Sequence, residues 1–143
     1  MKFTIRGEPK GMCDPRHRIV TPKDSRRKPF TMTYDPQGDF KESLRCIIQQ
    51  KAPEKPFTGP VALGIVAYLK IPKSASQKTR NLMLKWEIRP TKKPDCTNIA
   101  KLYEDLLTGI VFLDDKQVVD LVVSKFYSDT PRVEIEVREI TTV

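Results

Sequence analysis

Three aspartates and one lysine have the residue types and the spacing of a metal-dependent hydrolytic site. Lys101 follows Asp95 by six positions, and the pair Asp114 and Asp115 begins 19 positions after Asp95. Carboxylates that gather at one point repel one another, and a divalent cation such as Mg²⁺ relieves the repulsion. Such a cation polarises a phosphodiester and lowers the pKa of its bound water, while a lysine nearby neutralises developing negative charge. Phosphodiester hydrolysis is therefore the first interpretation of these four residues.

These residues need a helix to position them, and the segment between them predicts one. Thr97 is suited to cap the start of a helix, and Gly109 lies where a left-handed residue commonly ends one. The helix is expected from about Asn98 to Thr108, with an apolar face and a separate polar stripe. The stripe carries Asn98, Lys101 and Asp105. We expect the stripe and the preceding Asp95 to face one cleft.

The chain after this helix must turn back if the acidic residues are to meet. A helix of about ten residues rises ~15 Å, and residues 110–113, if extended, travel ~13 Å in return. Asp114 and Asp115 would then lie close to Asp95. Spacing alone leaves a second interpretation open, in which Asp114 and Asp115 form a turn and Lys101 pairs with Asp105 on the helix surface.

The rest of the chain alternates between strand and helix patterns, which indicates an α+β (α/β) fold. Every second residue from Val61 to Ile71 is apolar, the clearest strand pattern in the sequence. Strands are also predicted over 2–8, 117–127 and 132–139, the last two as an antiparallel hairpin, and helices over 39–50 and 73–87. Five prolines and many basic residues predict a long loop over 9–36, either a solvated connector or a phosphate-contacting arm.

Length and composition indicate one soluble, intracellular domain over residues 1–143. The chain is 38% apolar and has three scattered cysteines, so neither a membrane helix nor a disulfide framework is expected. We therefore expect a cytoplasmic protein without membrane contact. The net charge of +8 is divided unevenly, with +6 over residues 1–69, +7 over 70–101 and −5 over 102–143. This basic excess favours a polyanionic partner such as nucleic acid.

Four short motifs follow one another between Lys93 and Val118. They are KPDCTN over 93–98, Lys101, DLLTG over 105–109 and DDKQV over 114–118. In order and spacing they resemble the RusA family of Holliday junction resolvases. Members of that family show Lys-Pro-Asp-x-Asp-Asn, a following lysine, an Asp-Ala-Leu-like helix end and Asp-Asp-x-Gln-Val. Compact members are frequent in phages and prophages, so a phage or prophage type is expected.

The resemblance implies a single domain with a small mixed sheet and two to three helices, working as a homodimer. It implies paired nicks in a four-way DNA junction, in DNA recombination and repair, with Mg²⁺ as the cofactor and Mn²⁺ as a substitute. Asp95, Lys101 and Asp115 correspond to the catalytic residues of the family. Asp114 is a supporting acid, and it joins Asp95 and Asp115 as a metal ligand.

Thr97 departs from the family pattern, which has a second carboxylate at this position. A threonine hydroxyl removes one negative charge from the expected metal site. Thr97 is then a weak metal ligand, only a helix cap, or the mark of an active site that binds DNA without cleaving it. The alternative functions are accordingly a catalytically weakened or inactive junction-binding protein and a small basic RNA-binding module.

The basic segments hold the candidates for contacts to DNA phosphates, which position DNA without reading its sequence. These candidates are Arg16, Arg18, Lys73, Lys78, Arg80, Lys85, Arg89, Lys92 and Lys93. No segment resembles a motif that reads base edges, so recognition of branched shape is expected.

Overall fold

β4 (Val61–Lys70) is an inner strand of a four-stranded mixed sheet. It runs antiparallel to β6 (Arg132–Glu139) and parallel to β5 (Val118–Ser128), while β1 (Lys2–Arg6) pairs with the other edge of β6. The strand order is therefore β1-β6-β4-β5. The computed structural model describes residues 1–141. The predicted α+β class with a mixed sheet is confirmed.

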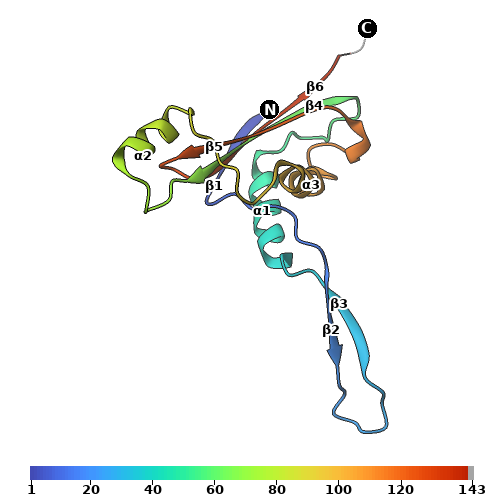
Figure 1. The fold of residues 1–143 in the computed structure, drawn as a ribbon. Helices are drawn as coiled ribbons and strands as arrows, with labels where there is room; N and C mark the ends of the chain where they lie inside the picture. The colour runs from blue at the N-terminus through green and yellow to red at the C-terminus, as the bar shows by residue number, and fades with distance from the viewer. Residues whose placement is uncertain (142–143) are drawn as a thin grey trace.

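Two helices cover one face of this sheet. α1 (Gly38–Lys51) and α3 (Cys96–Leu107) lie on the same side of it (Figure 1). Every second residue of β4 from Val61 to Leu69 belongs to the core on this side and is at most 2% exposed. The intervening residues of β4 belong to the opposite face, which we call the open face. Along β4 from Val61 to Val66, buried residues thus alternate with partly exposed ones, whereas Tyr68 on the open face is only 8% exposed.

Residues 16–34 form a hairpin that projects from the body, and we call it the arm (Figure 1). β2 (Arg16–Val20) pairs antiparallel with β3 (Phe30–Tyr34), and the two make a separate sheet. The prediction of a loop over 9–36 is wrong for residues 16–20 and 30–34, which form these two strands. The prolines excluded a helix, but Pro15, Pro22 and Pro29 flank the two five-residue strands and lie outside them, where proline is tolerated.

Two further expectations about strands are wrong. β5 and β6 do not form a hairpin, because β4 lies between them and pairs with both. Residues 110–113 are not an extended return but mostly a turn, in which the Gly109 N–H donates to the Phe112 carbonyl oxygen at 2.7 Å. Val111 and Phe112 are fully buried. Their apolar character therefore reflects burial in the core and not a strand.

The other predicted elements are present with modest changes of length. The first strand, β4 and α1 are confirmed, whereas α2 (Gln77–Leu84) covers only the middle of the predicted segment 73–87. α2 begins where the Ser76 hydroxyl caps it by accepting the Thr79 N–H at 3.2 Å. All three cysteines are free thiols. Among residues 1–141, no helix has the length and apolar character needed to span a membrane.

The outgoing connection to the arm crosses the start of α3. The Met12 N–H donates to the Asn98 carbonyl oxygen at 2.9 Å. Gly11 approaches so closely that a Cβ atom there would lie 2.9 Å from the Asn98 Cβ and 3.1 Å from the Pro94 Cβ. The root of the arm is therefore in direct contact with the N-terminal end of α3.

The returning connection is bonded to the outgoing one and to α1. The side chain of Gln37 donates to the Gly11 carbonyl oxygen and accepts the Cys13 N–H, both at 2.9 Å. Two residues earlier, the Asp35 carboxylate accepts from the Lys41 ammonium group at 2.7 Å. Lys41 is only 8% exposed. An ion pair between a nearly buried lysine and an exposed carboxylate thus holds the point where the arm rejoins the body.

We predict that the Asp35–Lys41 pair makes the stability of the fold depend on pH. The bond from Lys41 and the Gln37 N–H hold the pKa of Asp35 below its usual value of 3.8. A lowered pKa stabilises the folded chain above pH 3.8, and that contribution disappears as the pH falls through the lowered value. Asp35→Asn should lower the melting temperature at pH 7, with the difference from wild type vanishing in acid.

Thermal unfolding followed by circular dichroism between pH 2 and pH 8 measures this difference. The matched control is Asp14→Asn, because Asp14 is also exposed but lies outside the ion pair. A difference for Asp35→Asn that stays constant over the whole pH range would contradict the prediction.

Candidate active site

One side of α3 carries a row of outward-facing polar residues. The other side is anchored in the core, where Ile99, Leu102 and Leu106 have no exposed surface. Helical steps of four, three and four residues place positions 97, 101, 104 and 108 along one side. These residues are Thr97, Lys101, Glu104 and Thr108. The packing of α3 therefore directs the predicted catalytic lysine toward solvent.

Lys101 lines a cavity of about 570 Å³, which we call the acidic cavity. Its lining is Met12, Arg45, Lys101, Glu104, Asp105, Thr108, Asp114 and Asp115. The structure thus brings together three predicted site residues, Lys101, Asp114 and Asp115. Asp105 does not fulfil the predicted pairing with Lys101, because its carboxylate accepts from the Arg45 guanidinium at 3.3 Å.

Gln117 fixes the backbone that brings the two aspartates to this cavity. Its side-chain oxygen accepts the N–H groups of Leu113 and Asp114 at 2.8 and 2.9 Å. Its side-chain nitrogen donates to the carbonyl oxygens of Phe57 and Gly59 at 3.0 and 2.9 Å. The amide group therefore uses both of its donors and accepts two hydrogen bonds. Gln117 ties the acidic segment to the chain that enters β4.

Asp114 is a turn residue, as the second interpretation of its role proposed. Its carboxylate accepts the Lys116 N–H at 3.0 Å and caps the short helix η1 (Asp115–Gln117). That backbone bond lowers the pKa of Asp114. Asp115 lines the cavity as an exposed carboxylate.

Glu104 is a member of the site that sequence analysis missed. Burial raises the pKa of Glu104, and the negative charge of Asp115 raises it further. The two carboxylates therefore lie near enough to repel each other, and a cation at this point would relieve the repulsion. The signal in the sequence was its spacing, since Glu104 lies three residues after Lys101 and seven after Thr97 on the same side of the helix.

Asp95 lies in a neighbouring cavity of about 410 Å³ at the start of α3. It occupies the N-cap position, and its carboxylate accepts from the Asn98 side-chain amide at 2.9 Å. Thr97 is exposed inside the first turn, so its predicted role as the helix cap is wrong. Met12 borders both cavities, which makes the Asp95 cavity and the acidic cavity adjacent.

The three aspartates do not form the single cluster that their spacing predicted. In the part of the chain that the structure describes, no group of three or more His, Cys, Asp or Glu side chains could hold a metal ion. The physical reason is the turn at 109–112, which replaces the ~13 Å extended return with a compact reversal beside the later part of α3.

The donor chemistry of the acidic cavity still fits Mg²⁺. This ion takes oxygen ligands and is commonly bound by one or two protein carboxylates together with water and substrate phosphates. Asp114, Asp115 and Glu104 supply carboxylate oxygens there. A protein cage of three aspartates is therefore not required.

The candidate phosphate-binding residues fall into three groups. Arg16 and Arg18 lie on the arm. Four residues lie on α2 or next to it, namely Lys73, Lys78, Arg80 and Lys85. The segment that leads to Asp95 carries Arg89, Lys92 and Lys93. Eight of the nine are exposed, and Arg80 is partly covered by its ion pair with Asp129 at 3.4 Å.

Lys125 of β5 positions the segment before Asp95, and sequence analysis missed it as well. Its ammonium group donates to the carbonyl oxygens of Lys92 and Pro94 at 2.8 and 3.0 Å. The Arg89 side chain donates in turn to the Lys125 carbonyl oxygen at 3.0 Å. The sequence did carry a signal for this role. The alternation of side chains along β5 places Lys125 on the helix-covered face, where a lysine is unusual.

Comparison with known proteins identifies the family of this chain. A family model described as Endodeoxyribonuclease RusA matches residues 7–138. The chain belongs to the RusA family. It is 41% identical over 143 residues to the uncharacterized protein YqaN of Bacillus subtilis (strain 168), covering 99% of this chain and 97% of that protein. It is 29% identical over 110 residues to the crossover junction endodeoxyribonuclease rusA of Lactococcus phage r1t, covering 75% of this chain and 77% of the phage protein.

RusA membership confirms the resemblance carried by the motifs, and the structure explains their spacing. The KPDCTN motif spans the entry to α3, Lys101 lies on the outward side of the helix, and the DDKQV motif contains η1 with its capping residue and Gln117. The order of loop, helix and turn in this chain is what brings Lys101 and Asp115 to the same cavity. Endodeoxyribonuclease chemistry is accordingly the activity of the family to which these elements belong.

We predict that Gln117 is essential for the stability of the acidic segment. Gln117→Leu removes four hydrogen bonds and should lower the free energy of unfolding by about 2 kcal/mol or more, because each unsatisfied group costs about 1–3 kcal/mol. Urea denaturation measures the change. The control is Gln77→Leu on α2, where the side chain is exposed and donates only to Asn81, and where a change within about 0.5 kcal/mol is expected. Equal stability of the two variants would contradict the prediction.

Proposed function

We propose that this RusA-family chain is a metal-dependent endonuclease that nicks four-way DNA junctions, with Mg²⁺ as the cofactor and Mn²⁺ as a substitute. The observation that carries the proposal is the acidic cavity, where Lys101 lies with Asp114, Asp115 and Glu104. The name of the phage relative supports a crossover junction as the substrate. The exposed basic residues of the arm and of segment 89–93 supply contacts for DNA phosphates.

In this proposal the residues of the chain bind the cation, orient the groups of the site and balance the charge of the phosphate. Asp115 and Glu104 would hold the cation by carboxylate oxygens, together with water and substrate phosphate. Asp114 would support them as a nearby negative charge, and Asp95 is the second catalytic carboxylate in the adjacent cavity. Bound Mg²⁺ supplies a Lewis acid for the phosphodiester and a water of lowered pKa. Lys101 stabilises the negative charge that develops on the phosphate oxygens. Gln117 and Lys125 keep the two carboxylate-bearing segments in place.

Thr97 affects cleavage more than binding in this proposal. It is exposed four residues before Lys101, on the same side of α3. Its hydroxyl is a neutral oxygen, so it contributes less to cation binding than a carboxylate would. DNA phosphates bind through the basic residues elsewhere, and those contacts do not involve Thr97.

A nicking assay with a synthetic four-way junction tests the activity. Wild-type protein should nick the junction with Mg²⁺ or Mn²⁺, give no product with EDTA, and leave a linear duplex of the same sequence intact. Asp115→Asn and Lys101→Gln should each lower the rate about 100-fold or more and keep junction affinity within a few-fold. Glu54→Gln removes an exposed carboxylate outside both cavities and serves as the control.

The Thr97→Asp variant separates the possible outcomes. Restoring a carboxylate should raise the nicking rate about tenfold or more in Mg²⁺. An inert wild type with an active Thr97→Asp variant would identify a junction-binding protein that no longer cleaves. If both proteins are inert in both metals, the nuclease proposal is wrong. A clear preference for structured RNA over junction DNA would favour the RNA-binding alternative.

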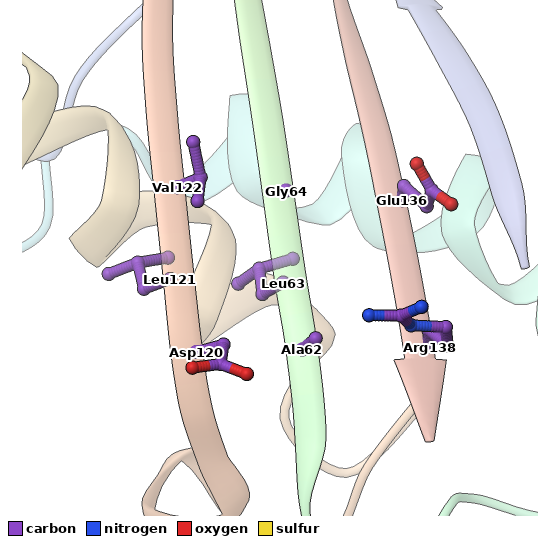
Figure 2. A pocket seen from close by; sticks show the side chains of 8 residues that line it. All are labelled: Ala62, Leu63, Gly64, Asp120, Leu121, Val122, Glu136 and Arg138. Atoms are coloured by element: carbon purple, nitrogen blue, oxygen red, sulfur yellow. The ribbon is translucent and has the colours of Figure 1, made fainter. Parts of the chain in front are cut away.

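We propose that the chain forms a homodimer and that the open face of the sheet is the interface. A four-way junction is a two-fold substrate, and paired nicks require two sites. Figure 2 shows this face with the helices behind it and Gly64 between Val122 and Glu136. The small residues Ala62 and Gly64 leave a hollow of about 550 Å³. Val122 is 65% exposed beside it.

The charges around the hollow suit a second copy of the same chain. Its rim carries two acidic residues, Asp120 and Glu136, and one basic residue, Arg138. A two-fold axis brings each surface against its own copy, so acidic and basic groups of the two copies can pair. A surface of one sign would repel its copy instead.

We predict that Val122→Glu gives a monomer, because it places a carboxylate in the apolar centre of this interface. At the same concentration, sedimentation velocity should show the wild type as a dimer and the variant as a monomer. The variant should dimerise with an affinity that is lower by about tenfold or more. Ile47→Glu is the control, since Ile47 is 36% exposed on α1, which covers the other face. A wild type that stays monomeric with and without DNA would contradict the dimer, and an unchanged variant would contradict this interface.

A further inference from the structure

The arm has two chemically different faces. Cross-strand partners in an antiparallel pair share a face of the ribbon. One face, which we call the arginine face, holds three such pairs: Arg16 with Tyr34, Arg18 with Met32, and Val20 with Phe30. The other face holds His17 with Thr33 and Ile19 with Thr31. Both arginines of the strands and both aromatic rings thus lie on one side.

Large apolar side chains on the arginine face are open to solvent. Phe30 is 54% exposed, Met32 42% and Tyr34 38%. The Arg18 guanidinium lies 5.8 Å from the centre of the Tyr34 ring, and its Nη2 lies 3.8 Å from the Met32 sulfur. A two-stranded hairpin is marginally stable alone in water, and a cluster of exposed apolar groups on it indicates a binding surface.

The charge of the arm identifies its occupant as a polyanion. Residues 16–34 contain six arginines and lysines and one acidic residue, Asp24, which gives a net charge of +5. The turn between the strands holds Lys23, Arg26, Arg27 and Lys28, all exposed. The arm of a second copy carries the same charge and would be repelled. Nucleic acid satisfies this charge and also offers flat apolar surfaces.

The aromatic rings distinguish branched DNA from a plain duplex. In a duplex the base planes are stacked on one another, and only base edges are accessible in the grooves. At a branch point stacking is interrupted, so base planes become available to aromatic side chains and arginine. The rings on the arginine face would strengthen binding by stacking on such planes, whereas phosphates alone offer them little binding energy.

We propose that the arginine face of the arm binds the branch point of junction DNA. Phe30, Met32 and Tyr34 stack on base planes there, while Arg16 and Arg18 contact neighbouring phosphates. The inference rests on the proposed function and names the element that selects branched over linear DNA. The Met12–Asn98 hydrogen bond joins the arm root to the start of α3, next to Asp95. Binding at the branch point would thereby set the position of the catalytic helix on the DNA.

The experiment compares junction and duplex binding for variants of the two faces. Affinities are measured by fluorescence anisotropy in EDTA, with a four-way junction and a linear duplex of matched sequence. The double variant Phe30→Ala/Tyr34→Ala should lose about tenfold or more in junction affinity, since stacking on one base is worth about fivefold or more and two rings are removed. Its duplex affinity should change less than about twofold. Ile19→Ala, which removes the 76% exposed side chain of the opposite face, should behave as wild type.

A second readout reports stacking directly. 2-Aminopurine at the branch point should decrease in fluorescence when wild-type protein binds, because an aromatic ring of the arm stacks on its free plane and quenches it. Phe30→Ala/Tyr34→Ala should abolish that decrease even at saturating protein. Phe30→Tyr, which keeps the ring, should retain it, and Phe30→Leu, which keeps apolar bulk in a folded arm, should lose much of it. Arg26→Gln/Arg27→Gln should weaken junction and duplex binding equally and reduce the salt dependence.

Each result decides the proposal. Equal losses for junction and duplex, or a double variant that matches Ile19→Ala, would overturn it. So would Phe30→Leu and wild type giving the same 2-aminopurine response. If the arm variants dissociate a dimer in the absence of DNA, the face serves a second copy and the proposal is wrong. A wild type that binds and gives the fluorescence response without nicking DNA rejects the nuclease function alone, and a nicking wild type with indifferent arm variants rejects the arm alone.

Discussion

The orientation of α3 is the constraint on which the site depends. Ile99, Leu102 and Leu106 have no exposed surface, and successive residues of a helix differ by ~100° in direction. Rotating α3 by one position would expose part of this apolar side, at about 25 cal/mol for each Å². The same packing holds Lys101 and Glu104 toward solvent. Lys101 and Glu104 therefore rest on a rigid element, as a site that aligns charged groups requires.

Periodicity made α3 and β4 predictable, because it reports burial directly. The stripe predicted at Asn98, Lys101 and Asp105 does not face one cleft, since Asn98 lines the Asp95 cavity and the other two line the acidic cavity. Periodicity reports nothing about neighbours, so β5 and β6 were paired with each other although β4 lies between them. Residues 110–113 show the same limit, since a short apolar run suits a strand and a buried turn equally. The arm was hidden for a different reason: its exposed strands carry no burial pattern, and proline was weighed by its number and not by its position.

The acidic site was predictable in its members near Lys101 and not in its extent. Motif order placed Asp114 and Asp115 with Lys101, whereas Glu104 escaped notice because it falls between the motifs. Asp95 was expected in the same cluster, and the short turn at 109–112 leaves it in the next cavity. Sequence spacing bounds how far a chain can reach, but the side chains that the core must bury decide how far it does reach.

The uneven charge along the chain becomes an uneven charge in space. The acidic last third contributes Asp114 and Asp115 to the cavity and Asp120 and Glu136 to the open face. The basic excess lies instead on the arm, on α2 and along segment 89–93. Phosphates attracted to these basic surfaces would be repelled by the acidic cavity unless a cation neutralised it. In the proposed mechanism the cation and the DNA therefore depend on each other, and neither surface would be sufficient for cleavage by itself.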